Sequence, residues 1–226
     1  MSDVELVVVE DAETAARTVA ERLAEAARAG SSIVLTGGST PRRAYELAAE
    51  LESDWSRPAL YWGDERCVPP DDENSNFLLA KESLLDRVTT APQSVHRIRG
   101  ELGRDEAAVA YELELGTAGL DVLLLGLGPD GHVASLFPDA PTLDERDRRA
   151  VGAEAGLEPW IDRVTLTLPT LCGAREVLFL VTGGGKADAA ARAFGGEPDR
   201  ATPGSLVRST AGRTWAVLDR AAASLL

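Results

Sequence analysis

Short apolar runs alternate along the chain with longer segments in which apolar residues recur every three or four positions. The runs predict strands, and the fully apolar ones at 122–125 and 177–181 predict strands buried on both faces of a sheet. They lie at residues 6–9, 33–35, 59–62, 122–125, 177–181 and 215–218. Residues 164–168 alternate between aliphatic side chains and threonine, which predicts one more strand with a wetter face.

The segments between these runs have the 3–4 spacing of amphipathic helices. Helices are predicted after Asp11, after Pro41, over residues 77–85 and 105–115, after Lys186 as far as Phe194, and after Asp219. Strands that alternate with helices predict an α/β fold, with a mostly parallel sheet and helices on both of its faces. Residues 138–159 lack periodicity, so we expect a long surface loop there with at most one helical turn, and a candidate lid.

Length and charge exclude several classes of protein. The 226 residues contain no repeat or linker, so we expect a single domain over residues 1–226. A net charge of -14 argues against nucleic acid or an anionic membrane as a partner. No apolar run approaches the roughly 20 residues of a membrane span. The first ten residues are acidic where a signal peptide is basic, so we expect a cytoplasmic protein.

Three strand-to-helix turns are rich in glycine and share one design. They are TGGST at 36–40, GLGPDGH at 126–132 and TGGGK at 182–186. Exposed amides in such turns form anion sites, and Ser39, Thr40 and Lys186 add further donors. None of the turns is a Walker A or dinucleotide fingerprint. Together with Arg66 they predict a pocket for a small phosphorylated metabolite, without a cofactor.

The chemistry is expected at His132, which follows a buried strand and lies two residues after Asp130. An imidazole titrates near neutrality and suits general-base catalysis. His96 lacks such a setting and is interpreted as structural. Asp64 has two open interpretations, as a second catalytic acid or as the hub of a polar network with Arg66. Cys67, Cys172 and the acids at 71–73 have no metal-ligand spacing, so we expect no metal.

Four motifs resemble the glucosamine-6-phosphate isomerase/6-phosphogluconolactonase family. They are TGGSTP, WGDERCVP with a following SN, LLLGLGPDGHVASLFP and VTGGGK, in this order between about residues 33 and 186. The resemblance implies a modified Rossmann-like sandwich, with His132 activating water beside Asp130. It also implies that Arg66 and Lys186 hold a phosphate, with the glycine-rich loop of Gly38, Ser39 and Thr40. Gly37 and Asp64 are expected to bind the substrate as well.

One position separates the two branches of that family. The deaminases carry a glutamate five residues after the histidine, whereas this chain has Phe137, which cannot relay a proton. The lactonase branch is therefore favoured, with a phosphosugar lactone as substrate, in a monomer or small homo-oligomer. A deaminase-like enzyme and a non-catalytic sugar-phosphate sensor remain as alternatives. A serine nucleophile at Ser39 or Ser135 is disfavoured because G-x-S-x-G does not occur.

Overall fold

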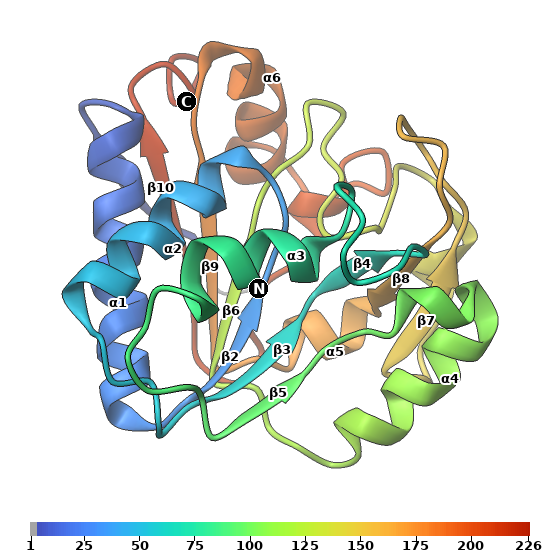
Figure 1. Cartoon of the computed structure of the whole chain (residues 1–226). Helices are drawn as coiled ribbons and strands as arrows, with labels where there is room; N and C mark the ends of the chain where they lie inside the picture. Colours follow the sequence, from blue (N-terminus) through green and yellow to red (C-terminus); the bar gives the residue numbers. More distant parts are fainter. Residues whose placement is uncertain (1–3) are drawn as a thin grey trace.

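The structure, a computed structural model, describes residues 4–226 and is built on a seven-stranded sheet (Figure 1). All neighbouring strands of this sheet pair in parallel, which confirms the predicted α/β class. Its strands, in spatial order, are β1 (Val4–Val9), β10 (Arg213–Asp219), β9 (Glu176–Val181), β6 (Val122–Leu125), β2 (Ser32–Leu35), β3 (Ala59–Trp62) and β5 (Ser94–His96). The central strands β6 and β9 are buried along their whole length, as their apolar runs predict.

A second, three-stranded antiparallel sheet was not predicted. It has the order β4 (Asp64–Arg66), β8 (Arg163–Leu166) and β7 (Ala150–Ala153). β7 lies inside the segment 138–159, so the prediction of a loop there is wrong in part, although Pro141–Asp144 does form the one helical turn. β8 is buried at all four positions, because it is the middle strand of this sheet, so the predicted wetter face is also wrong.

Helices cover the sheets. They are α1 (Ala12–Ala29), α2 (Ser39–Leu51), α3 (Asn76–Ala80) with a π-helical continuation (Lys81–Leu85), α4 (Arg104–Leu115), α5 (Leu168–Cys172), and α6 (Ala187–Ala190) with a π-helical continuation (Ala191–Gly195). Of these, α4 packs against β7 and β8 of the small sheet. Asp11 caps α1 by accepting from the amide of Thr14 at 2.8 Å. The prediction of a helix after Asp219 is wrong, because turns follow this residue. The Asp219 carboxylate accepts hydrogen bonds from the amides of Ala222 and Gly183.

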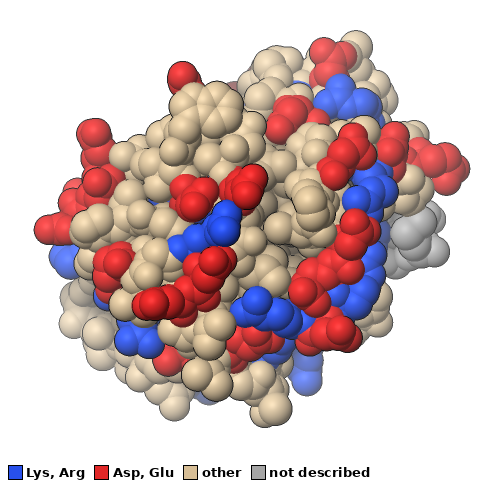
Figure 2. Space-filling model, turned by 90° about the vertical axis from the view of Figure 1, so that its right-hand side faces the viewer, with Lys and Arg blue, Asp and Glu red and all other residues tan. Residues whose placement is uncertain are grey.

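The surface is charged and of mixed sign. Figure 2 shows the face that carries α4 and the small sheet, where acidic and basic side chains are interspersed. Many surface charges form ion pairs, such as Arg148 Nε–Glu112 Oε2 at 2.9 Å. Within residues 4–226 no helix combines the length and hydrophobicity that crossing a bilayer requires.

Two buried tyrosines fasten helices to the ends of neighbouring strands. The hydroxyl of Tyr45, in α2, accepts from the amide of Thr36 and donates to its carbonyl oxygen, both at 2.8 Å. The hydroxyl of Tyr111, in α4, does the same for Trp62 at 2.9 and 2.8 Å. Burial raises the pKa of both phenols well above the usual range. The backbone is therefore fixed where β2 and β3 end and the loops begin.

Replacing Tyr45 by phenylalanine should destabilise the protein by roughly 2–6 kcal/mol. The change leaves a buried N–H and a buried C=O of Thr36 without partners, and each unpaired group costs about 1–3 kcal/mol. Denaturant unfolding measures the loss. Tyr61→Phe is the matched control, because the Tyr61 hydroxyl makes no hydrogen bond to residues 4–226, and its free energy of unfolding should change by less than about 0.5 kcal/mol. Equal values for the two variants would contradict this account.

Candidate functional site

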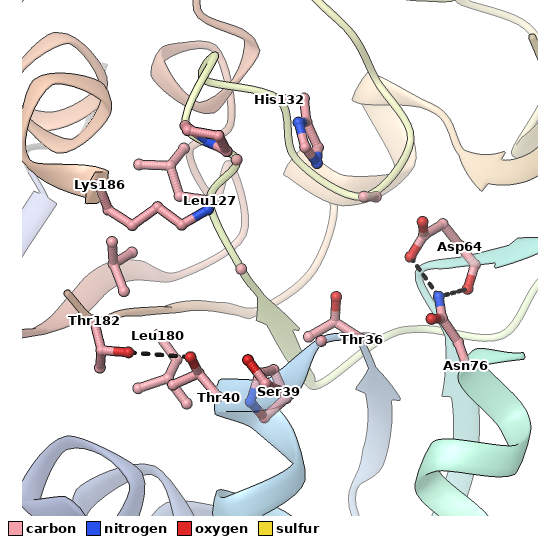
Figure 3. Close-up of a pocket in the computed structure, with 18 of the residues that line it drawn as sticks. Thr36, Ser39, Thr40, Asp64, Asn76, Leu127, His132, Leu180, Thr182 and Lys186 are labelled. Atoms are coloured by element: carbon pink, nitrogen blue, oxygen red, sulfur yellow. Dashed lines mark hydrogen bonds between the residues drawn. The ribbon is translucent and has the colours of Figure 1, made fainter. Parts of the chain in front are cut away.

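A pocket of about 300 Å³ opens at the carboxyl ends of the central parallel strands (Figure 3). The chain winds outward from β2 through β3 to β5, and from β6 through β9 to β10 in the other direction. The pocket therefore lies where the strand order reverses, the usual ligand site of such sheets. Of the predicted site residues, Gly37, Gly38, Ser39, Thr40, Asp64, Arg66, His132 and Lys186 line it. Asp130 is not in the pocket wall; it contacts the imidazole.

The turn after β6 holds an imidazole against a carboxylate. His132 Nδ1 lies 2.6 Å from Asp130 Oδ1, and the amide of His132 donates to the same oxygen at 3.1 Å. A carboxylate can only accept here, so Nδ1 carries the proton and Nε2 is left as a base. Burial alone would raise the pKa of Asp130, but the hydrogen bond from His132 and its charge lower it. The hydrogen bond thus orients the ring, and Nε2 has no hydrogen-bond partner among the described residues.

Close packing makes glycine necessary beneath this pair. A Cβ on Gly128 would lie 2.0 Å from His132 Nδ1 and 2.5 Å from Asp130 Oδ1. The same residue closes the turn, because its amide donates to the carbonyl oxygen of His132 at 2.9 Å. On another side, the Phe137 ring lies 5.2 Å from the imidazole, centroid to centroid. The imidazole is therefore enclosed, with about a fifth of its side chain exposed.

Alternation along β4 sends its side chains to two different environments. Asp64 and Arg66 line the pocket, while Glu65 points away from it. Burial raises the pKa of Glu65, although its carboxylate accepts hydrogen bonds from three backbone amides and a hydroxyl. The donors are the amides of Arg66, Asn76 and Phe77 and the Ser75 hydroxyl, at 2.7–3.0 Å. Glu65 therefore fixes the start of α3 against the pocket wall.

The partners of Asp64 settle part of its open interpretation. Its carboxylate accepts from Asn76 Nδ2 at 3.2 Å and from Ser135 Oγ at 2.7 Å. Among the described residues it forms no ion pair with Arg66, whose Nη1 donates to the carbonyl oxygen of Asn74 at 2.6 Å. Asp64 is a hub, but of a different network from the one expected.

Arg163 is a pocket residue that sequence reasoning missed. It is 4% exposed and lies directly opposite Arg66 in the register of β4 and β8. Its guanidinium donates to the carbonyl oxygens of Ile161 and Pro159 at 2.9 and 3.2 Å. Burial, and then the charge of Arg66, lower the pKa of Arg163. No feature of its sequence neighbourhood distinguishes it from the other arginines; only the strand pairing does.

Two like charges directly opposite on neighbouring strands are unfavourable. Neither guanidinium has a carboxylate within ion-pair distance in the described chain, and Arg66 Nε is buried without a hydrogen-bond partner. Such a pair has unused donors and unbalanced positive charge. It is therefore suited to bind an anion.

The opposite wall, on the left of Figure 3, carries Lys186 and two hydroxyls. Thr40 Oγ1 lies 3.0 Å from Thr182 Oγ1, which joins the loops after β2 and β9. Burial lowers the pKa of Lys186, while the charge of Asp130 opposes that shift. The first-turn amides of α2 have no acceptor within the helix and begin at this wall. This wall is therefore also suited to an anion.

Other reactive side chains lie outside this arrangement. Burial raises the pKa of Cys67 to about 11, which keeps its thiol protonated. His96 stacks on Tyr61 at 4.5 Å, and its Nδ1 lies 2.6 Å from Glu114, as suits a structural role. Over residues 4–226 no cluster of His, Cys, Asp or Glu has the geometry to hold a metal ion.

Gly128→Ala should displace the imidazole while the fold persists. The new Cβ would overlap both members of the pair, and the ring is the more mobile partner. The chain has only two histidines, so histidine ring ¹⁵N NMR can follow the change directly. We expect the His132 signals to shift and the His96 signals to stay. Gly119→Ala is the control, since nothing lies within 4 Å of its added Cβ. Unshifted His132 signals in Gly128→Ala would contradict the packing described here.

Comparison with known proteins agrees with this geometry. The family model for glucosamine-6-phosphate isomerases/6-phosphogluconolactonase matches residues 9–216. A 6-phosphogluconolactonase of Streptomyces coelicolor is 42% identical over 255 positions, covering 100% of this chain and 96% of the relative. The solved 6-phosphogluconolactonase from Trypanosoma cruzi aligns with a TM-score of 0.89 at 27% identity, covering 100% of this chain and 98% of that one.

A monomeric glucosamine-6-phosphate deaminase aligns with a TM-score of 0.87 at 20% identity, covering 99% of this chain and 100% of the deaminase. That likeness concerns the fold alone, which both branches share. The family match spans nearly the whole sequence and includes all four motifs. This chain belongs to the glucosamine-6-phosphate isomerase/6-phosphogluconolactonase family.

Proposed function

We propose that this chain is a 6-phosphogluconolactonase, which hydrolyses 6-phosphoglucono-δ-lactone to 6-phosphogluconate with water activated by His132. One observation carries the proposal: a histidine–aspartate pair and three basic side chains, Arg66, Arg163 and Lys186, meet at one pocket. We expect it to act in the cytoplasm, as a monomer or small homo-oligomer, without a cofactor or metal.

The phosphate anchors the substrate. Arg66 and Arg163 on one wall and Lys186 on the other supply the charge, and the loop of Gly37, Gly38, Ser39 and Thr40 supplies amides and hydroxyls. Binding a dianion relieves the repulsion between the two guanidiniums, so the free site is poised for this ligand. Anchoring the phosphate fixes the distant lactone carbonyl relative to His132.

The reaction then needs one base. Neutral His132 takes a proton at Nε2 from water as the oxygen attacks C1, and Asp130 stabilises the imidazolium that forms. Backbone amides of the glycine turns are candidates to stabilise the oxyanion. When the ring C1–O bond breaks, His132 returns the proton to the departing oxygen. A lactone is an activated ester, so a base worth about 10²–10⁴-fold together with positioning is sufficient.

Two alternatives lose support from the geometry. Phe137 packs on the imidazole where a deaminase would need a proton-relaying carboxylate, which favours the lactonase branch. Ser135 is fully buried with its hydroxyl bonded to Asp64, so it is not placed to act as a nucleophile.

His132→Ala should reduce kcat for 6-phosphoglucono-δ-lactone by about 10²–10⁴-fold, because the base is removed. Its affinity for 6-phosphogluconate should stay within about threefold, since the phosphate contacts remain. A coupled turnover assay and calorimetry measure the two quantities, with glucosamine 6-phosphate as the comparison substrate. His96→Ala is the control and should keep full activity. Unchanged turnover in His132→Ala would refute the proposed base, and a wild-type chain that prefers glucosamine 6-phosphate would refute the function.

The affinity for 6-phosphogluconate should begin to fall at a lower pH than it would if Lys186 had the pKa of an ordinary lysine. Burial lowers the pKa of Lys186 from 10.5, and a bound phosphate favours the charged form. Between the two pKa values binding takes up a proton, so affinity falls as pH rises. Lys186→Arg should remove this fall, because arginine stays charged. Calorimetry from about pH 7 to 10 tests it; an identical pH dependence in the variant would exclude Lys186 from the phosphate site.

A further inference from the structure

A buried hydrogen-bonded cluster joins the turn that carries His132 to the pocket wall that carries Asp64. Ser135, three residues after His132, is fully buried, and its hydroxyl donates to Asp64 Oδ2 at 2.7 Å. Its amide donates to Thr165 Oγ1 at 3.2 Å. Thr165 is the β8 residue directly opposite Asp64. Ser135 therefore bonds to both strands of that pair and does not itself line the pocket.

The turn that presents Ser135 is held in an unusual conformation. Ala134 has φ 48°, in the left-handed region that residues with a Cβ seldom adopt. Val133 and Leu136 are hydrogen-bonded to each other across it, amide to carbonyl in both directions. Such a conformation persists only where the surroundings fix it. The two hydrogen bonds of Ser135 supply that restraint, while Ala134 forms part of the pocket wall.

The Asp64 carboxylate keeps unused capacity to accept hydrogen bonds. It is 5% exposed, lines the pocket, and lies across it from Lys186 (Figure 3). An ionised carboxylate has about four acceptor sites, and neutral donors from Asn76 and Ser135 fill one on each oxygen. In the described chain no basic group lies within ion-pair distance of it. The remaining acceptor sites suit a hydroxyl of the sugar and repel its phosphate.

We propose that Ser135 is a positioning residue that, with Asn76, orients Asp64 to accept a hydrogen bond from a hydroxyl of the substrate. The same contact fixes the Asp64 carboxylate relative to the turn of His132. The group that binds the hydroxyl and the proposed base are therefore held at a fixed distance from each other. The inference rests on the proposed function, because it names which part of the phosphosugar Asp64 binds.

A double-mutant cycle tests whether Ser135 acts through Asp64. Ser135→Ala should lower kcat/KM for the phosphorylated lactone by about tenfold, the loss of one bond to a charged acceptor. In an Asp64→Asn background it should add less than about twofold, since residues acting through one contact are not additive. Ser83→Ala is the matched control. Ser83 is equally buried, and its hydroxyl donates one hydrogen bond to the carbonyl oxygen of Leu79. Removing this hydroxyl should lower Tm about as much as Ser135→Ala does, without changing activity.

Several outcomes would overturn the inference. One is a kcat/KM of Ser135→Ala equal to that of the wild type. Another is a double variant in which the losses of kcat/KM from the two single variants multiply. The third is an activity loss in Ser83→Ala as large as that in Ser135→Ala. The hydroxyl itself is tested with deoxy analogues of 6-phosphogluconate, measured by calorimetry. The wild type should bind at least one analogue more weakly than it binds the parent ligand, whereas Asp64→Asn should bind that analogue and the parent ligand equally well. If both proteins bind that analogue more weakly than the parent ligand by the same factor, the role of Asp64 is refuted. If the wild type shows no turnover, the proposed function fails, and the cycle measured as binding still decides the role of Ser135.

Discussion

Parallel pairing is the constraint on which the rest of this structure depends. Parallel strands bring their carboxyl ends to the same edge of the sheet, and each must be followed by a crossover. The turns after β2, β6 and β9 therefore emerge side by side, although the first and the last of them are separated by more than 140 residues along the chain. The strand order reverses between β2 and β6, so the loops that follow these two strands diverge and leave a crevice at their carboxyl ends. His132, the hydroxyls of Ser39 and Thr40, and Lys186 line one pocket because these three turns leave the sheet at the same edge.

In the described chain the pocket has unpaired basic side chains, although the molecule as a whole is strongly acidic. The chain has a net charge of -14, and most arginines on its surface have carboxylate partners. Inside the pocket, Arg66, Arg163 and Lys186 have no carboxylate within ion-pair distance among the described residues. Acidic surroundings repel anions at long range, so an anion in this pocket would be attracted mainly by these few partly desolvated side chains at short range.

Local sequence patterns predict six of the seven strands of the large sheet, all but β5, and much of the pocket. Apolar runs locate its central strands, and glycine turns after three of them locate the loops, because both signals are contained in adjacent residues. The same logic finds His132 and Asp130, which lie in one turn.

The small sheet and Arg163 depend on pairing between distant segments. β4 has only three residues, two of them charged toward the pocket, so it has no apolar run. β7 contains Ala150, Val151 and Gly152, too short a segment to predict a strand. Arg163 becomes a pocket residue only because β8 pairs with β4. Ser135 and Asp64 likewise meet across 71 positions.

The alternation along β4 has a consequence for how this segment can vary. Asp64 and Arg66 face the pocket, and Glu65 between them holds the start of α3. A single inserted or deleted residue after β3 would exchange the two faces, turning the glutamate toward the pocket and withdrawing both of the side chains that now line it. Evolution can therefore substitute side chains along β4 more readily than it can change the spacing between them.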